Sequence, residues 1–387
     1  MFDMAISTEP HTAFTTEELQ RYSRQLSLPE FGADGQKKLR EARVLIIGAG
    51  GLGCPAALYL AAAGIGTLGI VEFDTVDITN IHRQILYSAS DVGIPKIDVA
   101  RERIQATNQN VSVECFATRL TSANALEIMS GFDVVIDASD NFATRYLVND
   151  AAVISKIPSI YGSIHRFEGQ LSVFGAEDGP CYRCLFRDPP PAGAVPNCAE
   201  AGVLGVLPGI IGSLQAAEAI KIVAEIGEPL IGRLLLFDAL SMSFRTLQLR
   251  RDPDCPTCGV AATPMLVDYD VLCAADTTVP DEVETISPRE LSQLLDSKRD
   301  IDLVDVREEY EWNIARIEGA RLVPLGNLSR ELKSFDPNRK TVLYCKTGIR
   351  SDSAARMLMA AGISNVANLS GGIVRWSREV DPSLTLY

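Results

Sequence analysis

Histidine and tryptophan are scarce in this chain of 387 residues, which has three histidines and two tryptophans. With so few histidines, a zinc site would have to be rich in thiolate ligands, and a histidine-based nucleophile triad has few candidates. Basic residues are also in deficit, because 36 Lys+Arg face 50 Asp+Glu. This balance is opposite to what binding to nucleic-acid phosphates or anionic lipid needs. We therefore expect neither nucleic acid nor a membrane as a partner.

The N-terminal segment, 1–14, has no Lys or Arg and no apolar run. It lacks the features of a secretory leader, so we expect a flexible N-terminus and a cytoplasmic protein. The run 54–71 is free of charge and long enough to resemble a membrane helix, but Pro55 and the glycines after it interrupt it. A helix, a turn and a buried strand explain it better. Nine cysteines without an export signal favour metal or thiol chemistry over disulfides.

Short β-branched runs alternate with helical stretches through the first two thirds of the chain. We predict strands at 44–47, 67–72, 111–116, 133–137, 169–174 and 234–237, and helices at 53–63, 142–155 and 209–226. The helix 209–226 is apolar on most faces and should be buried. Alternation of this kind is typical of an α/β fold with a Rossmann-like, doubly wound and mostly parallel sheet.

Composition divides the chain into two domains. The stretch 252–288 contains no Lys or Arg but several acids, and we predict an acidic linker at 261–283, although 266–272 could instead pack as a terminal strand. The first domain would then cover 15–260. A second, small α/β domain covers 284–387, with a helix opening at 287–290 and strands at 301–306 and 341–344.

Prolines at 189–191 and 196 forbid a helix or central strand in the segment 187–202. We therefore expect an irregular crossover there. Its one reactive candidate is Cys198.

A glycine-rich loop follows the first predicted strand. Gly48, Gly50 and Gly53 have the GxGxxG spacing, which lets a phosphate approach the backbone at a helix N-terminus. Glu72 or Asp74, about 20 positions on, is placed to bind ribose hydroxyls. By this spacing NAD and ATP fit equally well, and a tight turn without a ligand is the simplest alternative.

Two cations close behind the loop favour ATP. A triphosphate under attack needs positive charge on its oxygens, which Arg83 and Lys96 would supply, whereas a dinucleotide needs only backbone N–H groups. Both could instead be solvated surface charges. Asp140, beyond the strand 133–137, lies where ligands bind in this architecture and would hold magnesium, unless it is only the N-cap of the next helix. The role of the arginines in 21–25 stays open between a phosphate contact across a dimer and surface charge.

Two CxxC pairs, Cys181 with Cys184 and Cys255 with Cys258, are far apart in sequence. Four thiolates at these spacings suit a closed tetrahedral zinc site without an open catalytic position. The alternative is a redox dithiol. We predict a structural zinc that pins the end of the first domain back onto the segment before the crossover.

The last cysteine loop, 344–351, lies between a predicted strand and the predicted helix 352–361. Loop N–H groups, a helix N-terminus, Lys346 and Arg350 would surround Cys345 and stabilise an anionic sulfur, either a thiolate or a persulfide. A phosphatase loop follows a related logic, and a buried strand-end cysteine is the structural alternative.

These motifs together resemble a known family. The first 260 or so residues are similar to the MoeB/ThiF adenylyltransferases, which resemble ubiquitin-activating enzymes, through 21–25, 48–53, 80–84, Lys96, 140–141 and the CxxC pairs. The last 100 resemble a rhodanese domain, through 305–307, 318–320, the Cys345 loop, 371–373 and Trp376. Their fusion is similar to MoeZ-type adenylyltransferase/sulfurtransferases. Two departures are Glu72, where the family usually has Asp, and Ala315-Arg316, where rhodanese domains often have Gly-His.

The resemblance implies functional residues for ATP with magnesium. The implied ATP-binding residues are Gly51, Glu72, Thr79, Asn80, Arg83, Lys96, Asp140 and Asn141. The implied catalytic residues are Cys345, Cys198, Asp140 and Arg24. Arg24 would enter from the partner subunit of a homodimer, and Cys198 occupies the place of a second reactive cysteine.

The resemblance further implies a reaction. ATP would adenylate the C-terminal glycine of a small ubiquitin-like sulfur-carrier protein, and a Cys345 persulfide, charged by a donor such as a cysteine desulfurase, would convert the adenylate to a thiocarboxylate. A NAD-dependent dehydrogenase, a non-catalytic carrier-binding scaffold, and thioester transfer through Cys198 with a regulatory rhodanese domain are the rivals. The carrier and the pathway, whether molybdenum cofactor, thiamin, cysteine or tRNA thiolation, stay open.

Overall fold

A computed structural model describes residues 14–176, 179–189, 202–269, 283–297, 300–328 and 330–385. The chain separates into two compact units, Met1–Ala274 and Ala275–Tyr387, and each is described by itself. The expectation of a flexible 1–14 falls almost wholly outside the described residues, as does Cys198.

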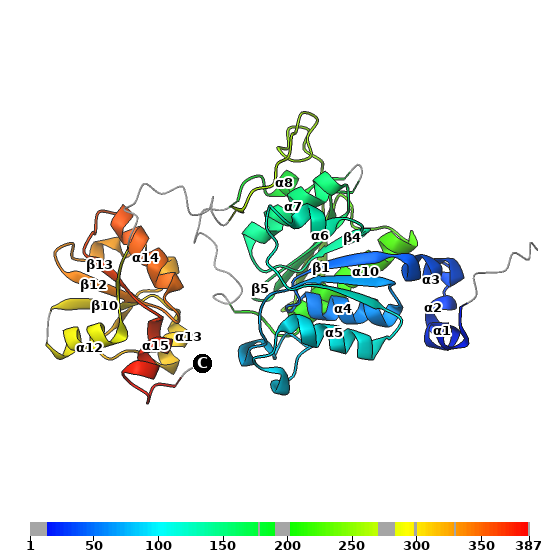
Figure 1. Ribbon diagram of the computed structural model, residues 1–387. Coiled ribbons are helices and arrows are strands. Elements are labelled where there is room, and N and C mark those ends of the chain that lie inside the picture. Colours follow the sequence, from blue (N-terminus) through cyan, green and yellow to red (C-terminus); the bar gives the residue numbers. More distant parts are fainter. Residues whose placement is uncertain are drawn as a thin grey trace, which may run out of the picture. The chain divides into compact units, whose positions relative to one another are not determined.

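An eight-stranded sheet in the order β3-β2-β1-β4-β5-β6-β7-β8 is the centre of the first unit (Figure 1). Its first half is parallel and doubly wound, as predicted. These strands are β1 (Arg43–Ile47), β2 (Thr67–Val71), β3 (Ser112–Phe116), β4 (Val134–Asp137) and β5 (Ser159–His165). The β-branched and aliphatic residues of β1, β2 and β4 are buried on both faces, as a central parallel strand requires.

The second half of this sheet is antiparallel. It consists of β6 (Glu168–Phe174), β7 (Arg233–Asp238) and β8 (Ser243–Gln248). β5 and β8 were not predicted from the sequence, because β5 is interrupted by Gly162 and all residues of β8 are exposed. Neither strand therefore shows the hydrophobic pattern of a buried strand.

Helices cover both faces of the first sheet (Figure 1). One core lies under α3 (Gly32–Glu41), α4 (Gly53–Ala63), α5 (Lys96–Thr107) and α10 (Leu207–Ala224). The opposite core lies under α6 (Ala125–Met129) and α7 (Phe142–Ser155). Shorter helices are α1 (Thr16–Arg21), α2 (Ser23–Leu26), α8 (Tyr182–Leu185), η1 (Ile78–Asn80) and η2 (Ala89–Asp91).

Helix α10 is long and apolar enough to cross a membrane by length and composition alone. Half of that window is buried in the structure, and core helices of globular domains pass the same test. The run 54–71 forms most of α4, a turn and β2, as predicted.

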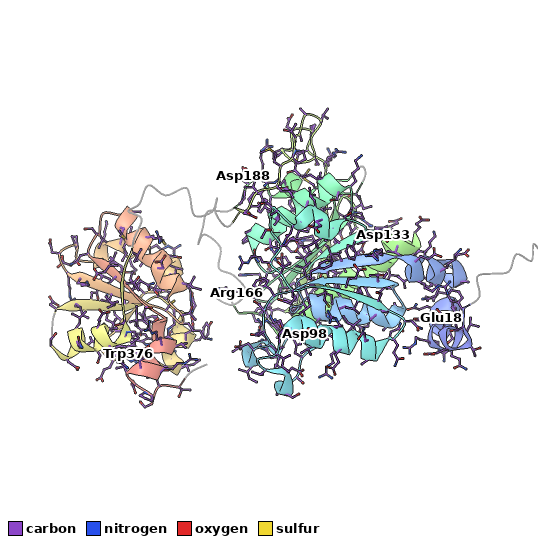
Figure 2. The ribbon with its side chains drawn as sticks, viewed as in Figure 1. Glu18, Asp98, Asp133, Arg166, Asp188 and Trp376 are labelled. Carbon is purple, nitrogen blue, oxygen red and sulfur yellow. The ribbon has the colours of Figure 1, made fainter. Side chains whose placement is uncertain are left out.

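The second unit is a five-stranded parallel sheet in the order β11-β10-β12-β13-β9. Its strands are β9 (Glu284–Ile286), β10 (Ile301–Asp305), β11 (Arg321–Leu322), β12 (Lys340–Tyr344) and β13 (Val366–Leu369). Its helices are α12 (Pro288–Asp296), α13 (Glu309–Ile314), α14 (Ile349–Ala360), α15 (Gly372–Glu379), η3 (Leu325–Asn327) and η4 (Leu332–Ser334). Trp376, labelled in Figure 2, is buried in the core between α12, α15 and the sheet.

Helix boundaries in this unit follow local capping. Ser287 forms a capping box with Glu290 and opens α12 where the sequence predicted. α14 begins at Ile349, three residues before the predicted start, because Gly348 adopts a positive φ of 100° and turns the cysteine loop directly into the helix.

The predicted linker 261–283 starts with residues that pack on the first unit. Leu266 and Val267 contact the core beneath α7, and Tyr269 is buried. Residues 262–268 contain no strand, so the alternative of a terminal strand is wrong for this described part.

Candidate nucleotide site, cysteine cluster and thiol loop

The glycine loop joins β1 to α4 through a very close backbone contact. A Cβ at Gly53 would lie 2.0 Å from the carbonyl oxygen of Gly48, so only glycine allows the helix to start this close to the strand. Gly48 itself has a φ of 95°, a conformation that residues with a Cβ rarely adopt. The sequence therefore dictates a tight strand-to-helix turn. The free N–H groups at the N-terminus of α4 then lie at the carboxyl edge of the sheet.

A pocket lies at this edge of the parallel sheet. Among the residues that the sequence assigned to ATP, those that line it are Gly51, Glu72, Arg83, Lys96, Asp140 and Asn141. The connections that follow β1, β2 and β4 thus converge on one place, as expected at the switch point of a doubly wound sheet.

Glu72 is held by three backbone N–H groups. Its carboxylate accepts hydrogen bonds from Ala49 in the glycine loop at 3.0 Å, from Phe73 at 2.8 Å and from Asp74 at 2.9 Å. The side chain ties the end of β2 to the glycine loop. Because carboxylate oxygens have further lone pairs, Glu72 can still accept a ribose hydroxyl.

Arg83 is positioned by the 3₁₀ turn before it. Its guanidinium donates to the carbonyl oxygen of Thr79 at 2.8 Å and to Oδ1 of Asn80 at 2.9 Å. Gln84 donates to the same Asn80 oxygen at 3.1 Å. Thr79 and Asn80 thus support the cation that lines the pocket. The hydroxyl of Thr79 donates a hydrogen bond to the carboxylate of Asp77 at 2.6 Å.

Lys96 is a buried cation at the first residue of α5. Only 6% of its side chain is exposed, and Nζ lies 3.2 Å from the Asp74 carboxylate. Its backbone N–H also donates to the carbonyl oxygen of Asp74 at 2.9 Å. The simple surface-charge alternative is therefore wrong for Lys96, because a solvated lysine would not be fixed in this way.

The loop after β4 separates the roles of three acidic and amide side chains. Asn141, rather than Asp140, caps α7, since its Oδ1 accepts the N–H of Thr144 at 2.8 Å. The alternative role of Asp140 as the cap is wrong, and its exposed carboxylate lines the pocket. Beneath it, the buried Asp137 accepts the N–H and hydroxyl of Ser139 at 3.0 and 2.6 Å. Burial raises the pKa of Asp137.

Two further cations line the pocket that the sequence analysis missed, Arg119 and Arg145. Arg145 is buried, donates to the carbonyl oxygen of Ser139 at 3.3 Å and stacks over the ring of Phe142. Two sequence signals could have found them. Arg145 lies four positions after Asn141 and thus on the same face of α7, and Arg119 follows the carboxyl end of β3.

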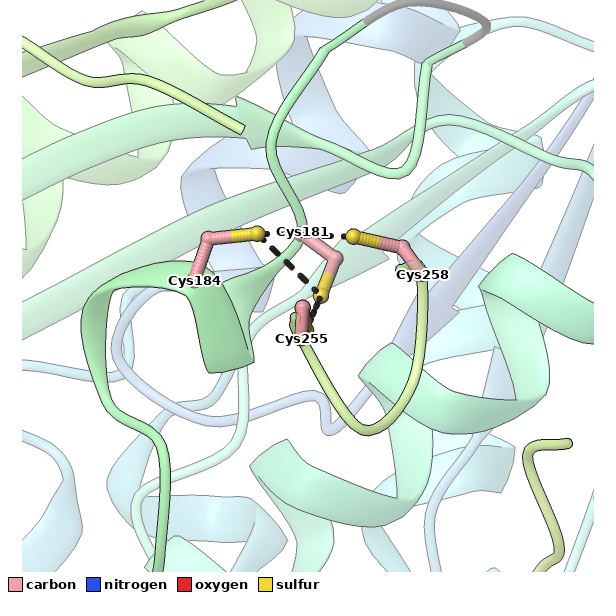
Figure 3. A group of neighbouring side chains, drawn as sticks. All are labelled: Cys181, Cys184, Cys255 and Cys258. Atoms are coloured by element: carbon pink, nitrogen blue, oxygen red, sulfur yellow. Dashed lines mark hydrogen bonds between the residues drawn. The ribbon is translucent and has the colours of Figure 1, made fainter. Parts of the chain in front are cut away.

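The four CxxC cysteines converge, as Figure 3 shows. Their sulfur atoms all lie within 4.8 Å of one another, with Cys181 and Cys255 at 3.5 Å and Cys184 and Cys258 at 3.4 Å. Ligand sulfurs around a tetrahedral zinc are about 3.8 Å apart, so this donor set fits a metal ion of that type. A redox dithiol would need only one of the two pairs.

The thiols of this cluster influence one another's ionisation. Hydrogen bonding to Cys184 and burial raise the pKa of Cys181, while the Cys181 hydrogen bond and the Asp252 N–H lower that of Cys184 to about 5. Desolvation raises the pKa of Cys258 to about 11. A cation would remove this conflict, because it takes its cysteine ligands as thiolates.

Cys345 ends β12 and is surrounded by its loop. Its side chain is almost fully buried, and its sulfur accepts the N–H of Gly348 at 3.1 Å and lies 3.4 Å from the hydroxyl of Ser351. Ser351 is held in turn by Asn368 at 2.7 Å. One loop N–H group and one hydroxyl are therefore present at the sulfur.

Arg350 does not act as a free positive charge beside Cys345. Its guanidinium binds Glu311 through two hydrogen bonds of 2.6 and 2.8 Å, and both side chains are buried or nearly so. This pair fixes the start of α14 to α13 and balances the charge that the sequence analysis assigned to the loop. Ala315, at the departure from the rhodanese pattern, accepts a hydrogen bond from the fully buried Arg307.

The remaining predicted residues are placed as follows. Arg24 is exposed on α2, and in the described part of this chain it is not among the residues of the nucleotide pocket. Cys198 lies outside the described residues, but Val203, five positions later, lines the pocket. Two of the described cysteines lie outside these sites: burial raises the pKa of Cys54 to about 12, and Cys115 is half-buried.

Comparison with known proteins agrees with both the nucleotide pocket of the first unit and the thiol loop of the second. Residues 22–257 match the ThiF family, and residues 287–379 match the rhodanese-like domain. The chain is 48% identical over 98% of its length to a protein of Mycobacterium tuberculosis named probable adenylyltransferase/sulfurtransferase MoeZ, 98% of which is covered. It is 57% identical to the sulfur carrier protein adenylyltransferase of Thermus thermophilus, over 67% of this chain and 98% of the relative.

A solved structure of E. coli MccB with MccA-N7isoASN aligns with 62% of this chain and 74% of its own, with a TM-score of 0.56 and 25% identity. Together with the nucleotide pocket and the thiol loop, these similarities settle the family. The chain belongs to the ThiF family and, through its rhodanese-like domain, to the adenylyltransferase/sulfurtransferases.

Proposed function

We propose that this protein adenylates the C-terminal glycine of a small ubiquitin-like sulfur-carrier protein and then converts the adenylate to a thiocarboxylate. The observation that carries the proposal is the presence in one chain of a glycine-loop pocket lined by fixed cations and a cysteine whose sulfur accepts a loop N–H group. The Thermus relative is named a sulfur carrier protein adenylyltransferase, which supports the choice of carrier.

In the adenylation step, a carboxylate oxygen of the carrier attacks the α-phosphorus of ATP, and the bond to the β-phosphate breaks to release pyrophosphate. Arg83 and Lys96 oppose the negative charge that grows on the phosphate oxygens. Glu72 takes the ribose hydroxyls. Asp140 would hold magnesium, which shields the phosphates when it is bound.

In the sulfur-transfer step, a persulfide on Cys345, charged by a donor such as a cysteine desulfurase, attacks the acyl carbon and AMP leaves. The product is an acyl disulfide with Cys345. A Cys198 thiolate then attacks the Cys345 sulfur, which releases the thiocarboxylate and leaves a disulfide that an external dithiol reduces. The five peptide steps between Cys198 and pocket-lining Val203 span at most about 18 Å, which supports this assignment.

Two assembly features complete the proposal. The four-cysteine cluster holds a structural zinc, because its sulfur separations suit a closed tetrahedral site. The protein acts as a homodimer in which Arg24 of one subunit reaches the ATP phosphates of the other, consistent with its exposed position on α2.

The decisive experiment measures the intact mass of ubiquitin-like carriers ending in Gly-Gly after incubation with this protein, ATP, magnesium and a persulfide source. We expect one oxygen to be exchanged for one sulfur on the cognate carrier. Cys345→Ala should abolish this exchange and leave ATP–pyrophosphate exchange unchanged, while Cys198→Ala should trap the acyl disulfide. Full thiocarboxylate formation by Cys345→Ala would contradict the proposed role of Cys345.

A further inference from the structure

A buried carboxylate outside the nucleotide pocket collects hydrogen bonds from three separate parts of the first unit. Asp150 on α7 is 2% exposed. It accepts from Arg183 Nε at 3.1 Å and from Thr257 Oγ1 at 3.0 Å, and the hydroxyl of Tyr269 also binds it. A buried carboxylate of this kind is stabilised by the donors around it, so losing one of them leaves a buried polar atom without its partner.

Two of these donors belong to the cysteine knuckles. Arg183 lies between Cys181 and Cys184, and Thr257 lies between Cys255 and Cys258. Both side chains are buried. Each CxxC pair therefore presents one of its two intervening residues to the same carboxylate, so the geometry of the sulfur cluster and the geometry around Asp150 depend on each other.

The third donor ends a segment that we call the strap, residues 262–269. Leu266 and Val267 pack on the core beneath α7, and Asp268 accepts the N–H and hydroxyl of Ser122 at 2.7 and 2.9 Å. Tyr269 is 6% exposed and lies against Tyr146, with ring centroids 5.6 Å apart. Beyond Tyr269, residues 270–282 lead to Val283, where the described part of the second unit begins.

We propose that the metal-loaded cysteine cluster, acting through Asp150, fixes the strap and so sets the point from which the rhodanese-like domain is tethered. From Tyr269, the fourteen peptide steps to Val283 reach at most about 50 Å. If the strap were released back to Gly259, twenty-four steps would reach about 85 Å. Metal binding thus shortens the tether and raises the effective concentration of the second unit near the first.

Arg183 and Tyr146, which packs on Tyr269, also hold residues 187 and 188, from which the chain leads to Cys198. Arg183 donates to the carbonyl oxygen of Arg187 at 2.8 Å, and the hydroxyl of Tyr146 donates to that of Asp188 at 2.7 Å. Asp188 is labelled in Figure 2. The segment that carries Cys198 and the tether of the Cys345 domain therefore both start from the Asp150 cluster. Asp150 and Tyr269 are positioning residues, since neither lines the nucleotide pocket as described.

Hydroxyl-radical footprinting of the full-length protein tests this proposal, with zinc as the metal. Tyr269 should be protected in the zinc-loaded protein, and Met265, which is 74% exposed, provides a reference within the strap. Removal of zinc by a chelator should raise oxidation of Tyr269 relative to Met265 at least five-fold. The buried Tyr22 should stay protected, which shows that the unit remains folded.

A substitution tests the route through Asp150 without removing metal. Thr257→Val keeps the side-chain shape but removes one hydrogen bond to Asp150. In the zinc-loaded protein it should therefore raise the oxidation of Tyr269 relative to Met265 at least two-fold. Thr107→Val, whose hydroxyl bonds only within α5, is the matched control. Zinc loss with Tyr269 still protected, or an unchanged footprint in Thr257→Val, would overturn the proposal.

The proposal rests on the structural metal of the proposed function but not on sulfur transfer. The footprint is read without carrier or ATP, so its failure would leave the adenylation and thiocarboxylate assays standing. The reverse also holds, because a protein that makes no thiocarboxylate can still show a metal-dependent strap.

Discussion

Arg83 and Lys96 are each fixed by neighbouring backbone and side-chain groups before any nucleotide arrives. Preorganised cations of this kind stabilise charge in a transition state without reorganising during the reaction. We expect Arg83→Ala and Lys96→Ala each to lower kcat/KM for ATP–pyrophosphate exchange by about 10²–10³-fold. Arg101→Ala, an exposed change on the same helix as Lys96, should leave this kcat/KM unchanged. A normal rate of ATP–pyrophosphate exchange in Lys96→Ala would contradict the role of Lys96 in stabilising phosphate charge.

Asn80 presents a separate question, because the resemblance implies contact with ATP whereas its oxygen is occupied by Arg83 and Gln84. If Asn80 acts through Arg83, its loss should matter little once Arg83 is gone. We expect Asn80→Ala to lower pyrophosphate exchange about ten-fold alone and less than two-fold in an Arg83→Ala background. Fully additive effects in this double-mutant cycle would show instead that Asn80 meets ATP directly.

The junction between β1 and α4 is the element on which nucleotide binding depends. An added Cβ at Gly53 would meet the Gly48 carbonyl at 2.0 Å, so the helix must move away from the strand. We expect Gly53→Ala to destabilise the first unit by about 1–3 kcal/mol and to abolish ATP binding. Thermal unfolding and nucleotide titration measure the two effects.

Gly209→Ala is the matched control for that change. Gly209 lies in α10, where an added Cβ meets nothing within 4 Å, and alanine is the better helix former. Its unfolding temperature should be equal or higher, with ATP binding retained. An unfolding temperature of Gly53→Ala equal to that of the parent protein would refute the packing argument.

At the scale of the whole molecule, each of the two units has its own hydrophobic core. Only the first contains the nucleotide pocket, so ATP should stabilise that unit alone. We expect calorimetry to show two transitions, with ATP at one hundred times its Kd adding about 2.7 kcal/mol to one of them. A Glu72→Gln variant should weaken this shift. Equal movement of both transitions would contradict independent units.

Much of this architecture follows from local sequence. β-branched runs alternating with helical stretches specify a doubly wound sheet, and the glycine spacing specifies the tight turn at Gly48. The paired CxxC spacings and the cysteine before α14 likewise indicate thiol sites, because their chemistry depends on residues only a few positions apart. The exposed strand β8 escaped prediction, since it lacks that pattern.

Only the tertiary structure decided which distant side chains meet. Arg119 and Arg145 join the nucleotide pocket, Glu311 neutralises Arg350 from 39 positions away, and Tyr269 binds Asp150 across 119 positions. Sequence spacing carries no information about such contacts, because they arise when separate elements pack against one core. The chain thus determines its chemical groups locally, whereas packing determines which of them act together.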